Sequence, residues 1–95
     1  MSAFNISFYV ILRVTGVPQQ VTSFHVPPKT TVRILAHNNT QPGNAANVNV
    51  GLYPEVGAHG DVLTPGTEKL YPVSTTGNIY ITGAAGDGVL VTVKS

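Results

Sequence analysis

The sequence predicts an all-β fold, a small antiparallel β-sandwich or partly closed barrel of about seven or eight short strands. Apolar side chains recur at every second position in several short stretches, which is the spacing of a strand with one buried face. The ten glycines and seven prolines are scattered between these stretches, where such residues end strands and form turns. No segment offers the helices of a parallel α/β fold.

The first half of the chain contains three stretches with this spacing. Residues 4–14 predict a long first strand, which Gly16-Val17-Pro18 ends. Residues 21–26 predict a second strand, which stops at Pro27-Pro28 because proline has no backbone N–H for a β-ladder. Residues 32–37 predict a third.

The second half begins with a loop at residues 38–46, rich in asparagine and containing Pro-Gly. A fourth strand is expected at 48–52, and residues 53–60 are irregular. Val62-Leu63 leads into Thr64-Pro65-Gly66-Thr67, which predicts a type II turn with Gly66 at positive φ. Residues 69–73 form an edge strand, limited by Pro72. Residues 79–81 and 89–93 predict a terminal hairpin around the loop 83–88.

The inward-facing positions of these strands predict the hydrophobic core. It comprises Phe4, Phe8, Val10, Leu12, Val32, Ile34, Val48, Val50, Leu52, Ile79, Ile81, Val89, Val91 and Val93.

Length, charge and cysteine content narrow the class of protein. The 95 residues suit a single β-sandwich domain spanning 1–95. Charged residues make up only 9% of the chain and the net charge is +1, so a nucleic-acid partner is not expected. The chain has no cysteine, and no apolar run approaches the roughly 18 residues of a membrane helix. No secretion signal is apparent at the start of the sequence.

No motif indicates catalysis, a cofactor or a metal site, and we expect no enzyme activity. The four acidic residues, Glu55, Asp61, Glu68 and Asp87, fall in predicted turns or at strand ends. His25, His37 and His59 are too widely spaced to place two zinc ligands on one element. The glycine-rich segment 83–88 joins two strands, whereas a phosphate-binding loop opens a helix.

The outward-facing positions are less polar than a solvent-exposed sheet requires. Large apolar groups on this second face favour a partner or a neighbouring copy over solvent. The candidate protein-interface residues are Tyr9, Ile11, Arg13, Leu35, Tyr80 and Leu90.

From Thr31 onward the chain resembles small β-sandwich virion proteins of tailed bacteriophages. The matching elements are Val32, Ile34 and Asn38; Asn47, Val50 and Gly51; Leu63, Pro65 and Gly66; and Ile79, Tyr80, Ile81 and Gly83 with Val89, Val91 and Val93. The resemblance implies a capsid decoration (cement) protein, made in the host cytoplasm and located on the capsid surface of the virion. The first strand, residues 2–14, lies outside the match. We expect residues 1–14 to form a partner-facing or exchanged element.

The expected function is therefore to bind the outside of an assembled phage head and stabilise contacts between major capsid subunits. The expected partners are the major capsid protein and further copies of the chain, with a trimer favoured. The alternative is a carbohydrate- or receptor-binding domain of a head fibre or tail adhesin. That alternative expects Tyr53, Asn39, Asn44 and Asp61 to cluster at one end of the sandwich.

Overall fold

The computed structural model describes residues 5–52 and 60–94, and within them the chain forms eight strands and one short 3-10 helix, with no α-helix. The elements are β1 (Asn5–Ile11), β2 (Gln19–Gln20), β3 (Thr31–Leu35), β4 (Val48–Gly51), β5 (Asp61–Leu63), β6 (Glu68–Tyr71), η1 (Thr76–Asn78), β7 (Tyr80–Thr82) and β8 (Gly88–Lys94).

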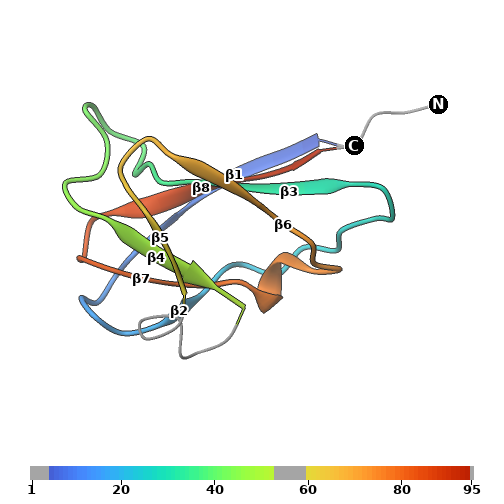
Figure 1. Cartoon of the computed structure of the whole chain (residues 1–95), viewed down its shortest axis with the longest axis horizontal. Coiled ribbons are helices and arrows are strands. Elements are labelled where there is room, and N and C mark those ends of the chain that lie inside the picture. Colours follow the sequence, from blue (N-terminus) through green and yellow to red (C-terminus); the bar gives the residue numbers. More distant parts are fainter. Residues whose placement is uncertain (1–4, 53–59, 95) are drawn as a thin grey trace.

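The strands form two antiparallel sheets of four strands each (Figure 1). One sheet has the order β1-β8-β3-β6 and the other has the order β2-β7-β4-β5; they are called sheet A and sheet B below. Successive strands change sheet at every connection except the one between β4 and β5. This is the strand order of an eight-stranded jelly roll, a two-sheet form of the β-sandwich. The predicted fold class is confirmed.

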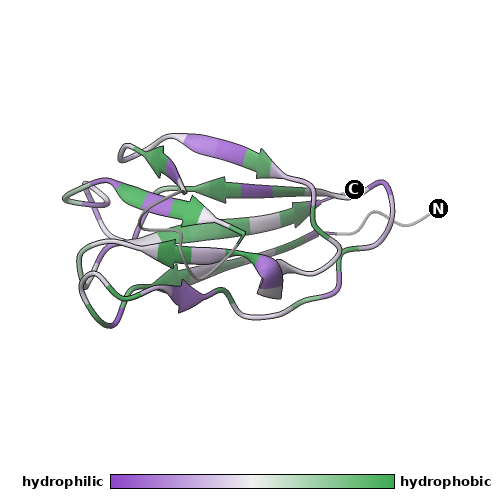
Figure 2. Ribbon diagram, turned by 60° about the horizontal axis from the view of Figure 1, so that its bottom comes forward, coloured by the Kyte–Doolittle hydropathy of each residue, from purple (hydrophilic) through white to green (hydrophobic). Residues whose placement is uncertain are grey.

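The core lies between the two sheets and is built largely from the alternating residues that the sequence indicates. Figure 2 shows hydrophobic and hydrophilic positions alternating along the strands. The buried members of the predicted core are Val10, Leu12, Val32, Ile34, Val48, Val50, Ile79, Ile81, Val89, Val91 and Val93. Phe8 is half-buried, and Phe4 lies outside the described residues. Leu52 was expected in the core but is 37% exposed, because β4 ends at Gly51 and the alternation stops with it.

The predicted second strand is wrong in position and length. β2 consists of Gln19–Gln20, and residues 21–26 form only one isolated bridge, between His25 and Thr75. Val21 and Val26 are buried, but the residues between them are exposed, so the period of two is broken. A side chain replaces part of the missing ladder. The Thr76 hydroxyl accepts from the Phe24 N–H and donates to the Thr22 carbonyl.

The predicted terminal hairpin is also wrong, because β7 and β8 belong to different sheets. β7 pairs with β2 and β4, whereas β8 pairs with β1 and β3. Both strands bury apolar side chains in the same core, but from opposite layers, and the glycine-rich connection between them crosses from one sheet to the other. The period of two identifies which face of a strand is buried, but it does not identify which strand pairs with it.

The turn at Thr64-Pro65-Gly66-Thr67 is as predicted. Gly66 has φ +85°, and the Thr67 N–H donates to the Thr64 carbonyl at 3.0 Å. This turn carries the chain from β5 in sheet B to β6 in sheet A. β6 lies at the edge of its sheet, as the proline after it indicates.

Candidate interaction surface

Four of the predicted interface residues lie together on the outer face of sheet A. Tyr9 stands opposite Leu90, and Leu90 stands opposite Leu35, so the three form a row across β1, β8 and β3. Ile11 is opposite Gly88, one step along the same face. Tyr9 is 41% exposed and Ile11 is 37% exposed. We call Tyr9, Ile11, Leu35 and Leu90 the outer patch.

Gly88 shapes one end of the outer patch because it has no side chain. A Cβ at this position would meet the Val10 carbonyl oxygen and would lie 2.9 Å from Ile11 Cδ1. Ile11 therefore occupies the space above Gly88. The His37 ring lies beside Tyr9, with 6.2 Å between ring centroids and an angle of 49°. The patch thus has one aromatic and three aliphatic members, and none of the four side chains carries a formal charge.

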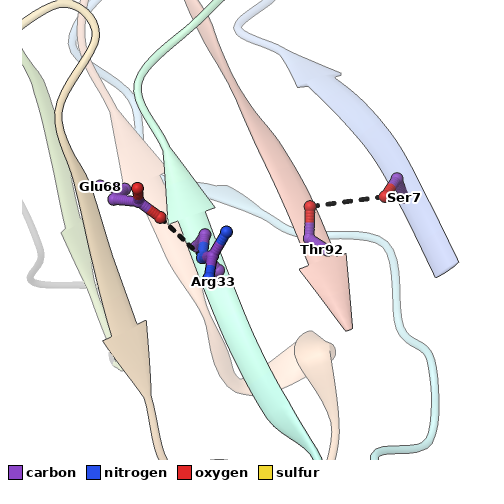
Figure 3. A network of polar contacts seen from close by, with 4 residues as sticks. All are labelled: Ser7, Arg33, Glu68 and Thr92. Atoms are coloured by element: carbon purple, nitrogen blue, oxygen red, sulfur yellow. Dashed lines mark hydrogen bonds and ion pairs between the residues drawn. The ribbon is translucent and has the colours of Figure 1, made fainter. Parts of the chain in front are cut away.

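The next row on the same face is polar (Figure 3). The Ser7 hydroxyl donates to Thr92 Oγ1 at 3.4 Å, and Thr92 stands opposite Arg33 in the register. Arg33 Nε lies 2.6 Å from Glu68 Oε2, and both side chains are about half exposed. Exposed pairs of this kind contribute little to stability, about 0–1 kcal/mol. The pair nevertheless neutralises the charge of Glu68, which stands opposite Leu35 of the outer patch.

The other two predicted interface residues are elsewhere. Tyr80 lies in β7 between Gln20 and Gly51, so it belongs to sheet B. Arg13 follows β1, and its backbone N–H donates to Gln19 Oε1 at 3.0 Å. The single outward face expected from the alternation is therefore divided between the two sheets and a loop.

The loop residues expected for a carbohydrate site do not come together in the described part of the chain. Asn44 is buried and forms two hydrogen bonds with the Gly88 backbone. Asn39 precedes β4, whereas Asp61 pairs with Val50 near the other end of that strand. Tyr53 lies outside the described residues. Asn44 and Asp61 also have internal partners, which leaves them less free to bind a sugar.

Asp61 belongs to a polar cluster that the sequence does not predict. Its Oδ2 atom lies 2.8 Å from Lys69 Nζ and accepts a hydrogen bond from the Tyr71 hydroxyl at 3.0 Å. Asp61 is in β5 of sheet B, and its two partners are in β6 of sheet A, so the cluster joins the edges of both sheets. The hydrogen bond from Lys69 lowers the pKa of Asp61. Burial, followed by the hydrogen bond to Asp61, raises the pKa of Tyr71.

The described residues contain no group of three His, Asp or Glu side chains placed to hold a metal ion. His59 is outside those residues. Within the same ranges there is no helix of the length and hydropathy needed to cross a membrane.

Comparison with known proteins places the chain in no family: no family model, no curated protein and no solved structure matches it.

Proposed function

We propose that this protein is a non-enzymatic virion protein that decorates the outside of a bacteriophage head and bridges neighbouring major capsid subunits. The proposed class of protein rests on the resemblance of the chain, from Thr31 onward, to small β-sandwich virion proteins of phages. The proposed binding surface rests on the outer patch of sheet A. It places four large apolar side chains on one open sheet face, flanked by a neutralised ion pair.

Such a surface suits docking on a protein lattice. Apolar area removed from water contributes roughly 25 cal/mol per Å², and association entropy offsets much of that gain. A protein that binds the assembled lattice better than free subunits stabilises the lattice by mass action. Because the patch members carry no formal charge, binding should depend only weakly on salt.

We further propose that the protein acts on the capsid as a homo-oligomer, with a trimer as the arrangement that suits three-fold positions. Closed cyclic symmetry is the rule for small soluble oligomers. The low charge of the chain, 9%, permits neutral surfaces of neighbouring copies to approach closely.

The test compares phage particles with and without the protein. We expect particles that lack it to lose resistance to heat and osmotic shock, and added protein to restore that resistance. Leu35→Asp should abolish the restoration, because it places a charge within the outer patch, opposite Leu90. Val62→Asp is the matched control, since Val62 is 59% exposed on a strand of sheet B. Both variants should keep a β-rich circular dichroism spectrum.

Particles that are equally resistant without the protein would count against decoration. The carbohydrate- or receptor-binding alternative then becomes testable by glycan array and whole-cell binding. The jelly-roll fold does not separate the two functions, because viral capsid domains and lectin domains both use it.

A further inference from the structure

The two sheets have four edge strands, and three of them carry features that discourage pairing with another chain. β6 turns Lys69 toward the core side, opposite Ile34, and Pro72 follows the strand. β5 has only three residues, and β2 has only two and is preceded by Pro18. Inward charges, prolines and short length are the means by which natural sheets protect their edges.

The fourth edge, β1, has none of these features. It is seven residues long, NISFYVI, and contains no charged residue and no proline. Within the described residues it pairs with β8 alone. In Figure 3 the strand carrying Ser7 lies at the outer side of the sheet. A long, uncharged, unpaired edge is a template for a further strand.

The register shows which backbone groups of β1 point away from β8. The Leu12 N–H donates to the Asp87 carbonyl, so Leu12 faces β8. Hydrogen-bonding direction alternates along an antiparallel strand, so Val10, Phe8 and Ile6 also face β8. The N–H and C=O groups of Asn5, Ser7, Tyr9 and Ile11 then point outward along the free edge.

Apolar side chains flank this row of polar backbone groups on both sides. On the core side, Ile6 and Phe8 pack against the core, and the Phe8 and Phe24 ring centroids are 4.9 Å apart. Phe24 itself is 37% exposed. On the other side are Tyr9 and Ile11 of the outer patch. An interface commonly combines such an apolar surround with a small set of hydrogen bonds.

We propose that β1 pairs with β1 of a second copy of this chain, antiparallel and about a two-fold axis at Ser7. A second copy fits because antiparallel pairing of a strand with itself is self-complementary. The strand has no charge, so no like charges meet across the axis. The two A sheets then join into one continuous sheet of eight strands.

Gln19 sets the register. Its Nε2 atom donates to the Ile11 carbonyl at 3.0 Å, and its Oε1 atom accepts from the Arg13 N–H at 3.0 Å. The end of the edge at Ile11 is therefore already capped. Within the described residues the outward groups of Asn5, Ser7 and Tyr9 have no other partner, and the arrangement that pairs all three places Ser7 opposite Ser7 of the second copy. Asn5 then stands opposite Tyr9 of the second copy.

The pairing is independent of the capsid proposal. A two-fold interface closes at two copies, so it predicts a dimer in solution, whereas the trimer proposed above belongs to the capsid-bound state. Strand pairing alone buries less than the roughly 1,200 Å² of a standard interface. The aromatic and aliphatic flanks of β1 must therefore contribute, and we expect a concentration-dependent dimer.

Single cysteine variants test the register, because the chain has no other cysteine. Hydrogen-bonded antiparallel partners have Cα atoms about 5.5 Å apart, within the range of a disulfide bond. Ser7→Cys should form a covalent dimer on mild oxidation. Tyr9→Cys and Asn5→Cys are matched controls on the same strand and face. Each is displaced from its own copy by four residues, about 13 Å along the strand, so neither should form a dimer alone. An equimolar mixture of the two should.

Solution measurements on the unmodified protein complete the test. Sedimentation equilibrium should give a monomer–dimer equilibrium. The Ser7 and Tyr9 amides should exchange slowly with solvent in the dimer and rapidly on dilution, whereas the Phe8 amide, bonded to β8, should be slow in both. A wild-type protein that stays monomeric at high micromolar concentration, or that forms only trimers, would overturn the proposal. So would oxidation of Ser7→Cys no faster than that of the two controls.

Discussion

Asn44 and Asp87 are polar side chains that the fold buries, and each supplies hydrogen bonds that regular structure would otherwise provide. Asn44 Nδ2 donates to the Gly88 carbonyl at 2.8 Å, and Asn44 Oδ1 accepts from the Gly88 N–H at 3.0 Å. These groups of β8 face the β3 side, just beyond the last ladder pair of Leu35 and Leu90. The asparagine amide therefore extends the ladder. The Asp87 carboxylate accepts from the Ala45 and Ala46 N–H groups, both at 3.0 Å.

We expect Asn44→Ala to lower the free energy of unfolding by about 1–3 kcal/mol, because it leaves a buried backbone N–H and C=O without partners. Asn47→Ala is the matched control. Asn47 is exposed in the same loop, and its loss should change stability by about 0.5 kcal/mol or less. Urea denaturation of the two variants measures the difference. Equal values would show that the Asn44 hydrogen bonds are not important for stability.

The contrast between Gly66 and Asn44 shows what a sequence reveals at the scale of a residue. The turn around Gly66 is predictable because proline and glycine fix it within four adjacent positions. The role of Asn44 depends on a partner 44 positions away, and no local pattern connects them. The contacts of Asp61 with Lys69 and Tyr71 span far fewer positions, and the predicted turn between β5 and β6 already brings these two strands close.

At the scale of elements, periodicity predicts buried faces well and pairing partners poorly. The alternation identifies Val32 and Ile34, or Val89, Val91 and Val93, as inward-facing, and all five are fully buried. It cannot show that β7 and β8 lie in different sheets, because both choices bury the same side chains. For the same reason the outward face predicted from the alternation is divided, with Tyr80 on sheet B.

The link between β5 and β6 should make stability depend on pH. Lys69 lowers the pKa of Asp61 from its ordinary value of 3.8 in the folded protein. A carboxyl group with a depressed folded pKa adds stability above its unfolded pKa, and that stability is lost as the pH falls through the folded pKa. We expect the free energy of unfolding to decrease below about pH 4. Asp61→Asn should weaken this decrease, by at most about 1 kcal/mol because the pair is exposed.

Lys69→Met provides the reciprocal control, since removing the cation should also flatten the acid limb of the stability profile. The same cluster acts in the opposite range through Tyr71, whose raised pKa adds stability that is lost as the pH rises above about 10. Tyr71→Phe should therefore flatten the alkaline limb, and it should also weaken the acid limb, because the Tyr71 hydroxyl helps to lower the pKa of Asp61. Denaturation midpoints between pH 2 and 11 that coincide for wild type and all three variants would contradict this account.

At the scale of the whole molecule, stability rests on the core between two thin layers. Ile34 projects from sheet A and Ile81 from sheet B, and both are 0% exposed. We expect Ile34→Ala and Ile81→Ala each to cost about 2–5 kcal/mol. That is a large share of the roughly 5–15 kcal/mol that holds a domain folded. Leu70→Ala is the control, because Leu70 is 56% exposed. Chemical denaturation that gives similar midpoints for all three would contradict the assignment of the core.

The position of β8 between β1 and β3 has a consequence for the order of folding during synthesis. β1 leaves the ribosome first among the eight strands, but its partner leaves last, so sheet A cannot be completed until the final strand arrives. The strands of sheet B are all available earlier. Contacts between such distant segments slow folding, and β1 stays unpaired in the meantime. A chain that stops before β8 would lose that strand and also both of its ladders, with β1 and with β3. Within the described sheet, β1 would then have no partner, because only β8 connects it to β3.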